Sequence, residues 1–452
     1  MTVTGEVQLP WDITRTFHWF AQPGAVRRLL PPWLPLKVLS EAQSLRAGTA
    51  LMQLPGGVRW IAQHQADEYV PERRFVDELA PAGVRALPTR ALTWRHEHDF
   101  EPVGAHETRV IDRINSNLPQ RAVRRMLDYR YRQLRGDFAA HQRAQDAGLG
   151  PQTIALTGSS GLVGQALGAF LSSGGHRVIK LVRHTPQQDL ERRWDPQNPQ
   201  HDLLAGVDAV IHLAGASIFG RFGHQHRRAV MASRIEPTRK LAQLAAASGV
   251  RSFISASAVG IYGSQAGPAE LDEQSPPGYG GDDFLADVTR RWEAAARSAE
   301  HGGVRSVQVR TGVVLDSAGG MLSVLRPLYA AGLGGRLGSG KQWFSWIGLD
   351  DLVEIYHRAL WDTELAGPVN AVAPHPVPNA EFSTQLAAVL RRPEIFPVPA
   401  LGPKLVLGQQ GAELLALADQ RVIPRLLLER EHSFRTPRVE QLLAHTLGRV
   451  GQ

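Results

Sequence analysis

The stretch Thr153-Ile-Ala-Leu-Thr-Gly-Ser-Ser-Gly-Leu-Val-Gly164 decides the fold of the larger part of this chain. An apolar run is followed at once by three glycines, and residues 165–172 continue with a helical pattern. Gly158 permits a tight turn, Gly161 lets the backbone approach a pyrophosphate, and Gly164 allows the helix to pack closely on the strand. The free N–H groups at the start of such a helix attract an anion. This spacing predicts a dinucleotide-binding loop, with an ordinary structural turn as the alternative.

The segments that follow the loop predict a parallel, doubly wound sheet. Short apolar segments alternate there with stretches of helical length, which is typical of α/β domains. The predicted strands are 153–157, 176–182, 209–213, 252–257 and 306–310. The second of them ends at Arg183, where an NAD site usually carries an acidic residue for the ribose 2′-hydroxyl. A cation at this position favours NADP(H), because it suits a 2′-phosphate; a surface arginine is the alternative.

The residues before the loop have a different pattern and end in a linker signal at 146–151, Asp-Ala-Gly-Leu-Gly-Pro. Partial period-2 alternation at 50–54, 58–61, 93–100 and 108–114 predicts strands, the last two joined as a hairpin. Apolar residues then recur every three or four positions over 120–145, which predicts one long amphipathic helix. Its stripe is Val123, Met126, Leu127, Tyr131, Leu134 and Phe138. We therefore expect an α+β domain over residues 1–147.

Composition excludes several classes of function. The 452 residues, 43% of them hydrophobic, suffice for two to four folded domains. The absence of cysteine excludes disulfides, thiolate catalysis and cysteine-bound metal. The net charge of +7 comes from scattered arginines without a recognition motif, so no nucleic-acid partner is expected. No apolar run reaches the ~20 residues of a membrane span and no signal peptide is visible, so we expect a cytoplasmic protein.

Five motifs occur in the order found in extended short-chain dehydrogenases, which this sequence resembles. They are Thr157–Gly164, Asp208–Gly215, Ser255–Gly263, Arg310–Leu315 and Trp346–Asp351. Three further stretches resemble the atypical branch called the epimerase family, or NAD-dependent epimerase/dehydratase-like proteins. They are Gly332–Gly340 with Trp343 to Trp346, Gly367–Asn370, and the tail Gly411–Ser433. The resemblance covers about residues 152–450 and implies a Rossmann domain over 152–398 with a C-terminal helical segment over 399–452.

The resemblance, together with the glycine-rich loop, implies an NADP(H) site and a small-molecule substrate. Arg234 is expected to help Arg183 bracket the 2′-phosphate. The predicted cofactor-binding residues are Gly158, Ser159, Ser160, Gly161, Leu162, Val163, Gly164, Val182, Arg183, Leu213, Ala214, Gly215, Arg234, Ser255, Arg310 and Val313.

The first 147 residues resemble, less specifically, the START-like helix-grip domains of the polyketide cyclase/dehydrase superfamily. The resemblance rests on Phe17–Phe20, Ala25–Trp33, the hairpin Thr93–Ile114 and the final amphipathic helix. It implies a sheet that wraps a long helix around an apolar cavity, lined in part by Trp94. A generic α+β domain without a cavity is the alternative.

The catalytic pattern departs from that of active short-chain dehydrogenases, in which a Tyr and a Lys four residues later transfer the proton. Ser257 stands where the substrate-binding hydroxyl belongs, but Asp283 and Asp287 occupy the dyad positions, and Tyr279 has no Lys after it. The candidate catalytic residues are Ser257, Tyr262 and Asp287; pocket lining is the alternative for Tyr262, and a solvated helix position for Asp287.

No metal site is expected, because the pairs His96/His98 and His224/His226 lack a visible third ligand. Two functions stay open. One is an NADP-dependent oxidoreductase or epimerase-like enzyme. The other is a non-catalytic NADP-binding sensor or apolar-ligand carrier, which the missing Tyr-x-x-x-Lys dyad favours. The sequence does not indicate an oligomeric state.

Overall fold

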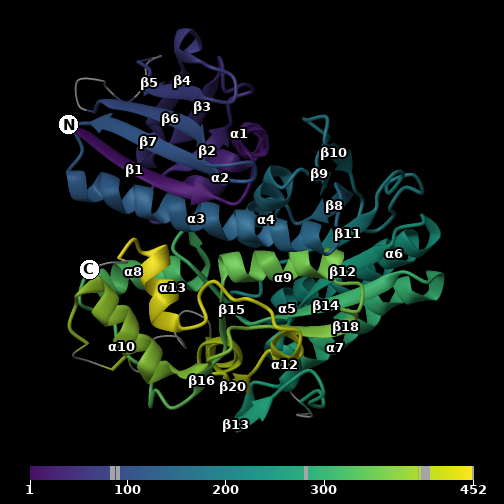
Figure 1. The fold of residues 1–452 in the computed structure, drawn as a ribbon. Coiled ribbons are helices and arrows are strands. Elements are labelled where there is room, and N and C mark those ends of the chain that lie inside the picture. The colour runs from purple at the N-terminus through teal and green to yellow at the C-terminus, as the bar shows by residue number, and fades with distance from the viewer. Residues whose placement is uncertain (82–86, 88–91, 279–282, 395–396, 399–407, 450–452) are drawn as a thin grey trace. The chain divides into compact units, whose positions relative to one another are not determined.

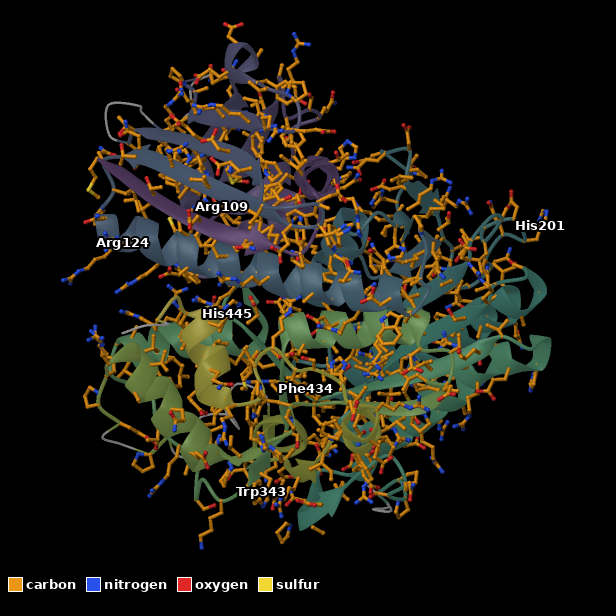
Figure 2. All side chains as sticks on the ribbon, in the orientation of Figure 1. Arg109, Arg124, His201, Trp343, Phe434 and His445 are labelled. Atoms are coloured by element: carbon orange, nitrogen blue, oxygen red, sulfur yellow. The ribbon has the colours of Figure 1, made fainter. Side chains whose placement is uncertain are left out.

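The computed structural model describes the chain except for residues 82–86, 88–91, 279–282, 395–396, 399–407 and 450–452 (Figure 1). It divides into two compact units. Unit 1 comprises Met1–Asp146, Ala169–Gly175 and His445–Gln452, and unit 2 comprises Ala147–Gly168 and His176–Ala444. Figure 2 shows the side chains that the helices and strands carry. Within the described residues, no helix is long and apolar enough to cross a membrane.

Unit 1 is built on a seven-stranded antiparallel sheet in the order β1-β7-β6-β5-β4-β3-β2. Its strands are β1 Thr2–Leu9, β2 Lys37–Ser40, β3 Thr49–Gln53, β4 Arg59–His64, β5 Arg74–Leu79, β6 Trp94–Pro102 and β7 Thr108–Ser116. Its helices are α1 Ile13–Ala21, α2 Ala25–Leu29 and α3 Gln120–Asp146. In Figure 1 the long helix α3 runs beside the sheet, next to β1.

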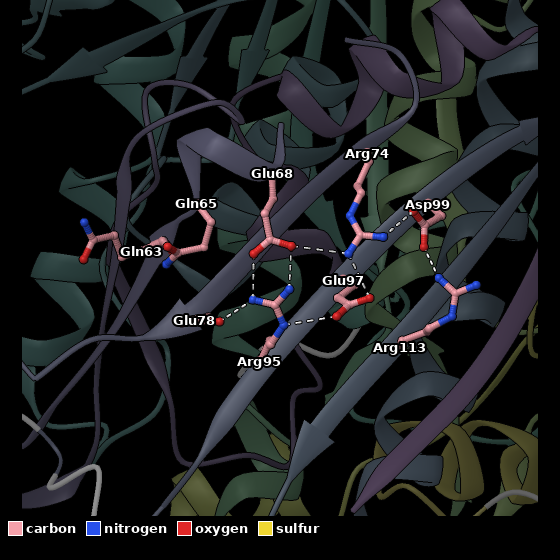
Figure 3. Close-up of polar contacts among 9 residues, drawn as sticks. All are labelled: Gln63, Gln65, Glu68, Arg74, Glu78, Arg95, Glu97, Asp99 and Arg113. Carbon is pink, nitrogen blue, oxygen red and sulfur yellow. Dashed lines mark hydrogen bonds and ion pairs between the residues drawn. The ribbon is translucent and has the colours of Figure 1, made fainter. Parts of the chain in front are cut away.

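The two faces of this sheet differ in character. Along β6, Trp94, His96, His98 and Phe100 are buried, while the side chains between them point to the other face. That other face carries a network of ion pairs in which Arg95 Nη2 lies 2.6 Å from Glu68 Oε2 (Figure 3). The remaining members are Arg74, Glu78, Glu97, Asp99 and Arg113. The alternation along one strand therefore separates a buried face from a charged one.

The core of unit 1 fills the space between the buried face and helix α3. Leu134 and Phe138, from the predicted apolar stripe, are fully buried, and Phe138 packs 4.4 Å from the ring of Trp11. A buried ion pair ties the short helix α2 to α3, with Arg28 Nε and Nη2 at 2.8 and 2.7 Å from the Asp137 carboxylate. Such a pair is retained only with good geometry, because both charges lose their water.

Unit 2 is built on a seven-stranded parallel sheet in the order β10-β9-β8-β11-β12-β14-β18. Its strands are β8 Thr153–Thr157, β9 Arg177–Val182, β10 Glu191–Arg193, β11 Ala209–His212, β12 Ser252–Ala258, β14 Arg305–Thr311 and β18 Gly367–Ala371. The strand order reverses between β8 and β11. In doubly wound sheets such a reversal opens a crevice at the carboxyl ends of the two strands, where ligands bind. The predicted Rossmann-like fold is thereby confirmed.

Among the described residues after residue 147, the helices include α4 Leu162–Ser173, α5 His224–Ala232, α6 Ile235–Ala247, α7 Phe284–Ala296, α8 Gly320–Ala330, α9 Leu349–Trp361, α10 Asn379–Leu390, α12 Arg425–Glu429 and α13 Val439–Thr446. Helix α6 packs on the sheet through Leu241, Ala242 and Ala245, which join Val210 and Phe253 in one apolar cluster.

In the part of unit 2 that the structure describes, there are also three small two-stranded sheets. They are β13 Gln265–Leu271 with β20 Asp419–Val422, β15 Val313–Asp316 with β17 Trp346–Gly348, and β16 Trp343–Phe344 with β19 Val377–Pro378. The tail of the chain is thus joined to unit 2 by strand pairing as well as by helices. Whether residues 1–147, 152–398 and 399–452 are separate folding domains stays a prediction.

Candidate functional site

The glycine-rich loop leads from β8 into helix α4 at the strand-order reversal. Gly158 has a positive φ of 68°, and its carbonyl accepts a hydrogen bond from the Gly161 N–H at 3.0 Å. A Cβ at Gly164 would lie 2.1 Å from that same carbonyl oxygen, so this position admits no side chain. Gly161 is exposed, and a Cβ there would meet only the Gly158 oxygen, at 3.4 Å. The open side of Gly161 is where the backbone can approach a phosphate.

A buried hydrogen-bond network joins this loop to the residues that follow β11. Thr157 Oγ1 accepts from the N–H groups of Leu213 and Ala214 at 3.0 and 3.1 Å. Its own hydrogen must therefore go to His212 Nδ1, 2.8 Å away, which leaves His212 Nε2 to donate to Thr238 Oγ1 at 2.9 Å. Burial and the charge of Arg234 lower the pKa of His212 to about 3. The neutral ring thus orients the Thr157 hydroxyl, which holds residues 213 and 214 beside the loop.

Arg234 is a buried cation in the same region. A Cβ on Gly215 would lie 3.0 Å from the Arg234 guanidinium carbon, so the guanidinium lies directly against the backbone after β11. It lies 5.0 Å from the Trp292 ring and donates to Val230 O and Ser233 Oγ, both at 3.3 Å. Within the described chain, none of its partners is a carboxylate. Burial lowers the pKa of Arg234 to about 10, so it stays charged at neutral pH.

The other predicted cofactor residues lie along the carboxyl edge of the sheet. Arg183 directly follows β9 and is exposed, and Val182 is partly buried. Ser255 is buried within β12, where its hydroxyl bonds to Ala256 O at 3.0 Å. Val313 begins β15 and is partly buried. The loop residues Ser159, Ser160, Leu162 and Val163 stay partly or fully exposed.

Two candidate catalytic residues and Arg310 belong to one buried cluster. Ser257 donates to Glu293 Oε1 at 2.6 Å, and Arg310 binds both oxygens of that carboxylate, at 2.8 and 3.0 Å. The Tyr262 hydroxyl lies 2.9 Å from Arg310 Nη1 and accepts from it. It can then donate to Asn370 Oδ1 or to the Asp272 carbonyl, each at 2.8 Å. Burial raises the pKa of Tyr262 to about 12. Tyr262 thus carries its proton at neutral pH.

Asp287, the third candidate catalytic residue, lies apart from this cluster in the first turn of α7. Its carboxylate pairs with Arg290 at 2.6 Å and with Arg291 at 3.0 Å. Partial burial raises the pKa of Asp287, but the two arginines lower it overall. Asp283 caps the same helix by accepting from the Ala286 N–H. Tyr279 lies outside the described residues.

The model of the NAD dependent epimerase/dehydratase family matches residues 154–371, and that of a domain of unknown function, DUF1731, matches residues 398–446. Epimerase family protein Mb2239 of Mycobacterium bovis is 40% identical over 301 residues, which are 66% of this chain and 98% of the relative. The chain belongs to the epimerase family. Human epimerase family protein SDR39U1 is 34% identical over 290 residues, 63% of this chain and 96% of the relative.

Two solved structures resemble this epimerase-family chain at appreciable sequence identity. A crystal structure described as the nucleoside-diphosphate sugar epimerase from Corynebacterium glutamicum has a TM-score of 0.85 and 40% identity. That match covers 99% of this chain and 90% of the other. The structure of human SDR39U1 isoform 2 with NADPH has a TM-score of 0.57 and 31% identity, over 65% of this chain and 99% of that one. The first match shows that residues beyond the Rossmann part also have a structural counterpart.

Sequence reasoning missed three functional-site partners in this epimerase-family chain. His212 belongs to the quoted motif 208–215, but nothing in its spacing showed that Thr157 would bond its ring. Glu293 lies 36 residues after Ser257 and gave no local signal. Trp292 faces Arg234 across 58 positions in the sequence. Each contact joins elements that only the sheet brings together.

Proposed function

We propose that this epimerase-family chain binds NADP(H) in the crevice between the Gly158–Gly164 loop and residues 213–215. The observation that carries the proposal is Arg234, a buried guanidinium that stays charged and has no carboxylate partner in the described chain. A buried cation without a counterion is unfavourable in the free protein and is stabilised when an anion binds. The 2′-phosphate of NADP is such an anion, and Arg183 at the end of β9 supplies a second, exposed cation.

The residues present fit this cofactor. The exposed Gly161 leaves room for a pyrophosphate, and the start of helix α4 supplies N–H groups to it. The proposed contacts are those predicted from the sequence: residues 158–164, Val182, Arg183, residues 213–215, Arg234, Ser255 and Val313. Arg310 acts indirectly in this proposal, because its guanidinium is bound to Glu293 and Tyr262. The human relative, whose structure is described as containing NADPH, supports the choice of NADP over NAD.

We further propose an oxidoreductase or epimerase-like activity on a small molecule. The nicotinamide, when bound, accepts or donates a hydride. Ser257 would orient the reacting oxygen of the substrate, and Glu293, held by Arg310, orients the Ser257 hydroxyl. Tyr262, protonated at neutral pH, is the candidate proton donor, and Asp287 stays a candidate base.

A second candidate, a non-catalytic sensor or carrier, is favoured by the missing Tyr-x-x-x-Lys dyad and by the fold of unit 1. A seven-stranded sheet in the order β1-β7-β6-β5-β4-β3-β2, with a long C-terminal helix, supports the START-like helix-grip proposal. The core of unit 1 includes Trp94, Leu134 and Phe138, so these residues would line any apolar cavity.

Calorimetry with NADPH and NADH tests the cofactor proposal on the full chain. We expect NADPH to bind at least about tenfold more tightly, since one charge-assisted hydrogen bond contributes roughly 1.5 to 3 kcal/mol. Arg183→Asp should reduce or reverse the preference. Equal affinities in the unmodified protein would contradict the proposal.

Turnover separates the two functions. The protein is incubated with NADPH and a panel of carbonyl compounds, sugar nucleotides and lipid-like molecules. Cofactor consumption or substrate isomerisation that Ser257→Ala abolishes supports the enzyme. Stoichiometric NADPH binding without turnover across the panel supports the sensor or carrier.

A further inference from the structure

Unit 1 brings together three metal-binding side chains that lie apart in the sequence. Asp77 of β5 stands directly opposite His96 of β6 in the sheet register, and His98 follows two residues later on the same face. One ligand atom from each of the three residues lies within 4.8 Å of the other two. The neighbouring strand thus supplies the third ligand that the pair His96/His98 lacked in the sequence.

Asp112 on β7 orients both imidazole rings. His96 Nε2 lies 2.9 Å and His98 Nδ1 2.7 Å from the same oxygen, Asp112 Oδ1. A carboxylate only accepts, so each of these nitrogens donates its hydrogen to Asp112. The opposite nitrogens, His96 Nδ1 and His98 Nε2, are then lone-pair donors, and both face Asp77. A carboxylate behind each metal-binding imidazole is a recurrent feature of metal sites.

Arg130 binds the other carboxylate oxygen of Asp112, with its Nε 3.2 Å from Oδ2. Its Nη2 also lies 3.1 Å from His98 Nδ1. His98 Nδ1 cannot accept from Arg130 while it donates to Asp112, and the shorter distance favours the bond to Asp112. The alternative is a cluster without metal, in which His98 Nε2 carries the hydrogen and donates to Asp77 at 3.4 Å.

Two of the three distances between the ligand atoms are close to those around a tetrahedral metal ion. Ligands at about 2.0 to 2.2 Å from such an ion lie about 3.3 to 3.6 Å from one another. Asp77 Oδ2 lies 3.4 Å from His98 Nε2 and 3.8 Å from His96 Nδ1. The longer of these two distances would shorten by a few tenths of an ångström if both atoms bound one ion.

The surroundings keep the ligands rigid and in the protonation states that bind metal. Phe75 stacks on His98 at 4.1 Å, and Trp94 packs edge-on against His96 at 5.9 Å. Burial lowers the pKa of His96 to about 4, so its ring is neutral. Burial raises the pKa of Asp77, but the polar contact with His98 and the nearby histidines lower it overall.

The charges around the cluster favour a cation. Burial also raises the pKa of Asp112, but Arg130 and the two histidines hold it well below its usual range. The cluster thus holds two carboxylates, Asp77 and Asp112, and the guanidinium of Arg130 pairs with Asp112. His64, opposite Asp77 on β4, has its Nδ1 2.7 Å from Ser44 O.

We propose that Asp77, His96 and His98 bind one divalent first-row transition ion, such as Zn²⁺, and that Asp112 positions the two imidazoles. Three protein ligands leave a fourth position of a tetrahedral ion for water or for a small molecule held in unit 1. The site is independent of the proposed NADP(H) crevice in unit 2.

Metal binding to the chelator-treated full chain tests the proposal. Zn²⁺ is titrated in competition with a chromogenic chelator, and bound metal is counted by mass spectrometry. We expect one tightly bound Zn²⁺ per chain. Asp112→Asn should weaken binding by about 10- to 100-fold, as for other residues behind a ligand, and Asp77→Asn by at least that factor. Wild-type protein without stoichiometric Zn²⁺, or Asp77→Asn protein that binds as tightly as wild type, would overturn the proposal.

Two matched variants serve as controls. Asp99→Asn removes a carboxylate from the residue next to His98, but on the charged face of the sheet. His201→Gln removes an exposed histidine of unit 2 (Figure 2). Neither should change Zn²⁺ affinity.

A measurement on the wild-type protein does not depend on the folding of any variant. With Co²⁺ in the site, the Asp112-bound N–H protons of His96 and His98 should give two exchangeable, paramagnetically shifted proton resonances. The absence of these resonances in protein that has taken up one Co²⁺ would overturn the ligand assignment.

Discussion

Replacing Arg234 by Met should abolish the preference for NADPH while leaving the free protein at least as stable. The two effects have one cause. Arg234 is buried and charged, yet it has no carboxylate partner in the described residues, so the free protein bears the cost of desolvating it. An anion that binds beside it would offset this cost.

The cost of burying the charge of Arg234 follows from its pKa, which burial lowers from 12.5 to about 10. One pKa unit corresponds to about 1.36 kcal/mol, so charge on the buried group costs the free protein roughly 3 kcal/mol. Because the folded pKa lies below the unfolded one, this cost is fully present at neutral pH. It disappears only as the pH rises from about 10 through 12.5.

The Arg234→Met substitution removes the charge, but it also removes the two hydrogen bonds at 3.3 Å and the contact with Trp292. Each of these three interactions contributes about 1 kcal/mol to the stability of the free protein. We therefore expect the free energy of unfolding at pH 7.5 to be unchanged or raised slightly. The NADPH dissociation constant should rise by about 10- to 100-fold, and that of NADH by less than about threefold.

Calorimetry with both cofactors and urea unfolding without cofactor measure these effects. Arg251→Met, which removes an exposed arginine paired with Asp208, is the control and should alter neither. An equal loss of affinity for NADH and NADPH would refute the reasoning. So would a loss of stability above roughly 2 kcal/mol, because Arg234 would then support the fold rather than the cofactor.

Three further predictions concern the loop, acid stability and the buried cluster. Gly161→Val should abolish NADPH binding, because the side chain would fill the space that the pyrophosphate approaches, yet the variant should fold, because a Cβ there meets only one backbone oxygen, at 3.4 Å. Gly164→Ala should also lower the melting temperature, because its Cβ would lie 2.1 Å from the Gly158 oxygen. Retained NADPH binding by Gly161→Val would count against the assignment of the loop to the cofactor. Burial lowers the pKa of His96 and His176 to about 4 and that of His212 to about 3. The unfolded chain therefore binds more protons than the folded protein below pH 6.5, so the free energy of unfolding should fall as the pH is lowered toward 3 to 4. The loss is up to about 1.4 kcal/mol per pH unit for each histidine. Urea unfolding across this range should show a shallower pH dependence for His176→Gln, and an unchanged dependence would contradict the assignment. Glu293→Gln removes the negative charge that pairs with buried Arg310 and should destabilise the protein by roughly 3 to 5 kcal/mol. Asp287→Asn breaks an exposed ion pair and should lower the free energy of unfolding by less than about 1 kcal/mol. Equal losses of stability in thermal unfolding would be inconsistent with the buried pair.

Five strands of the parallel sheet could be predicted because they are largely buried and therefore appear as apolar runs. The two outer strands, β10 Glu191–Arg193 and β18 Gly367–Ala371, were missed, because β10 is made of charged residues and β18 begins with Gly-Pro. The antiparallel sheet was predicted only in part. Strand β5, Arg74-Phe-Val-Asp-Glu-Leu79, was missed because it carries charged residues toward both faces. Arg74 points to the ion-pair network and Asp77 to the buried histidines, so the period-2 pattern is obscured. The strand β1, Thr2–Leu9, was missed as well.

The glycine-rich loop could be predicted because all its information is local. Arg234 could be named as a cation but not as one without a counterion, since that depends on which side chains the fold brings near it. The same limit applies to Asp77, which precedes His96 by 19 positions and meets it only through strand pairing. Sequence spacing thus predicts turns and loops, whereas contacts across a sheet depend on register.

The alternation along β6 also constrains how this strand can change in evolution. Insertion of one residue before His96 would turn Glu97 and Asp99 inward and send both histidines to the ion-pair face, because every side chain after the insertion changes sides. Insertions in the turn between β6 and β7, at residues 103–107, leave both faces intact. Among homologues that contain this unit, length variation should therefore be confined to the turn, and the strand itself should vary only by substitution.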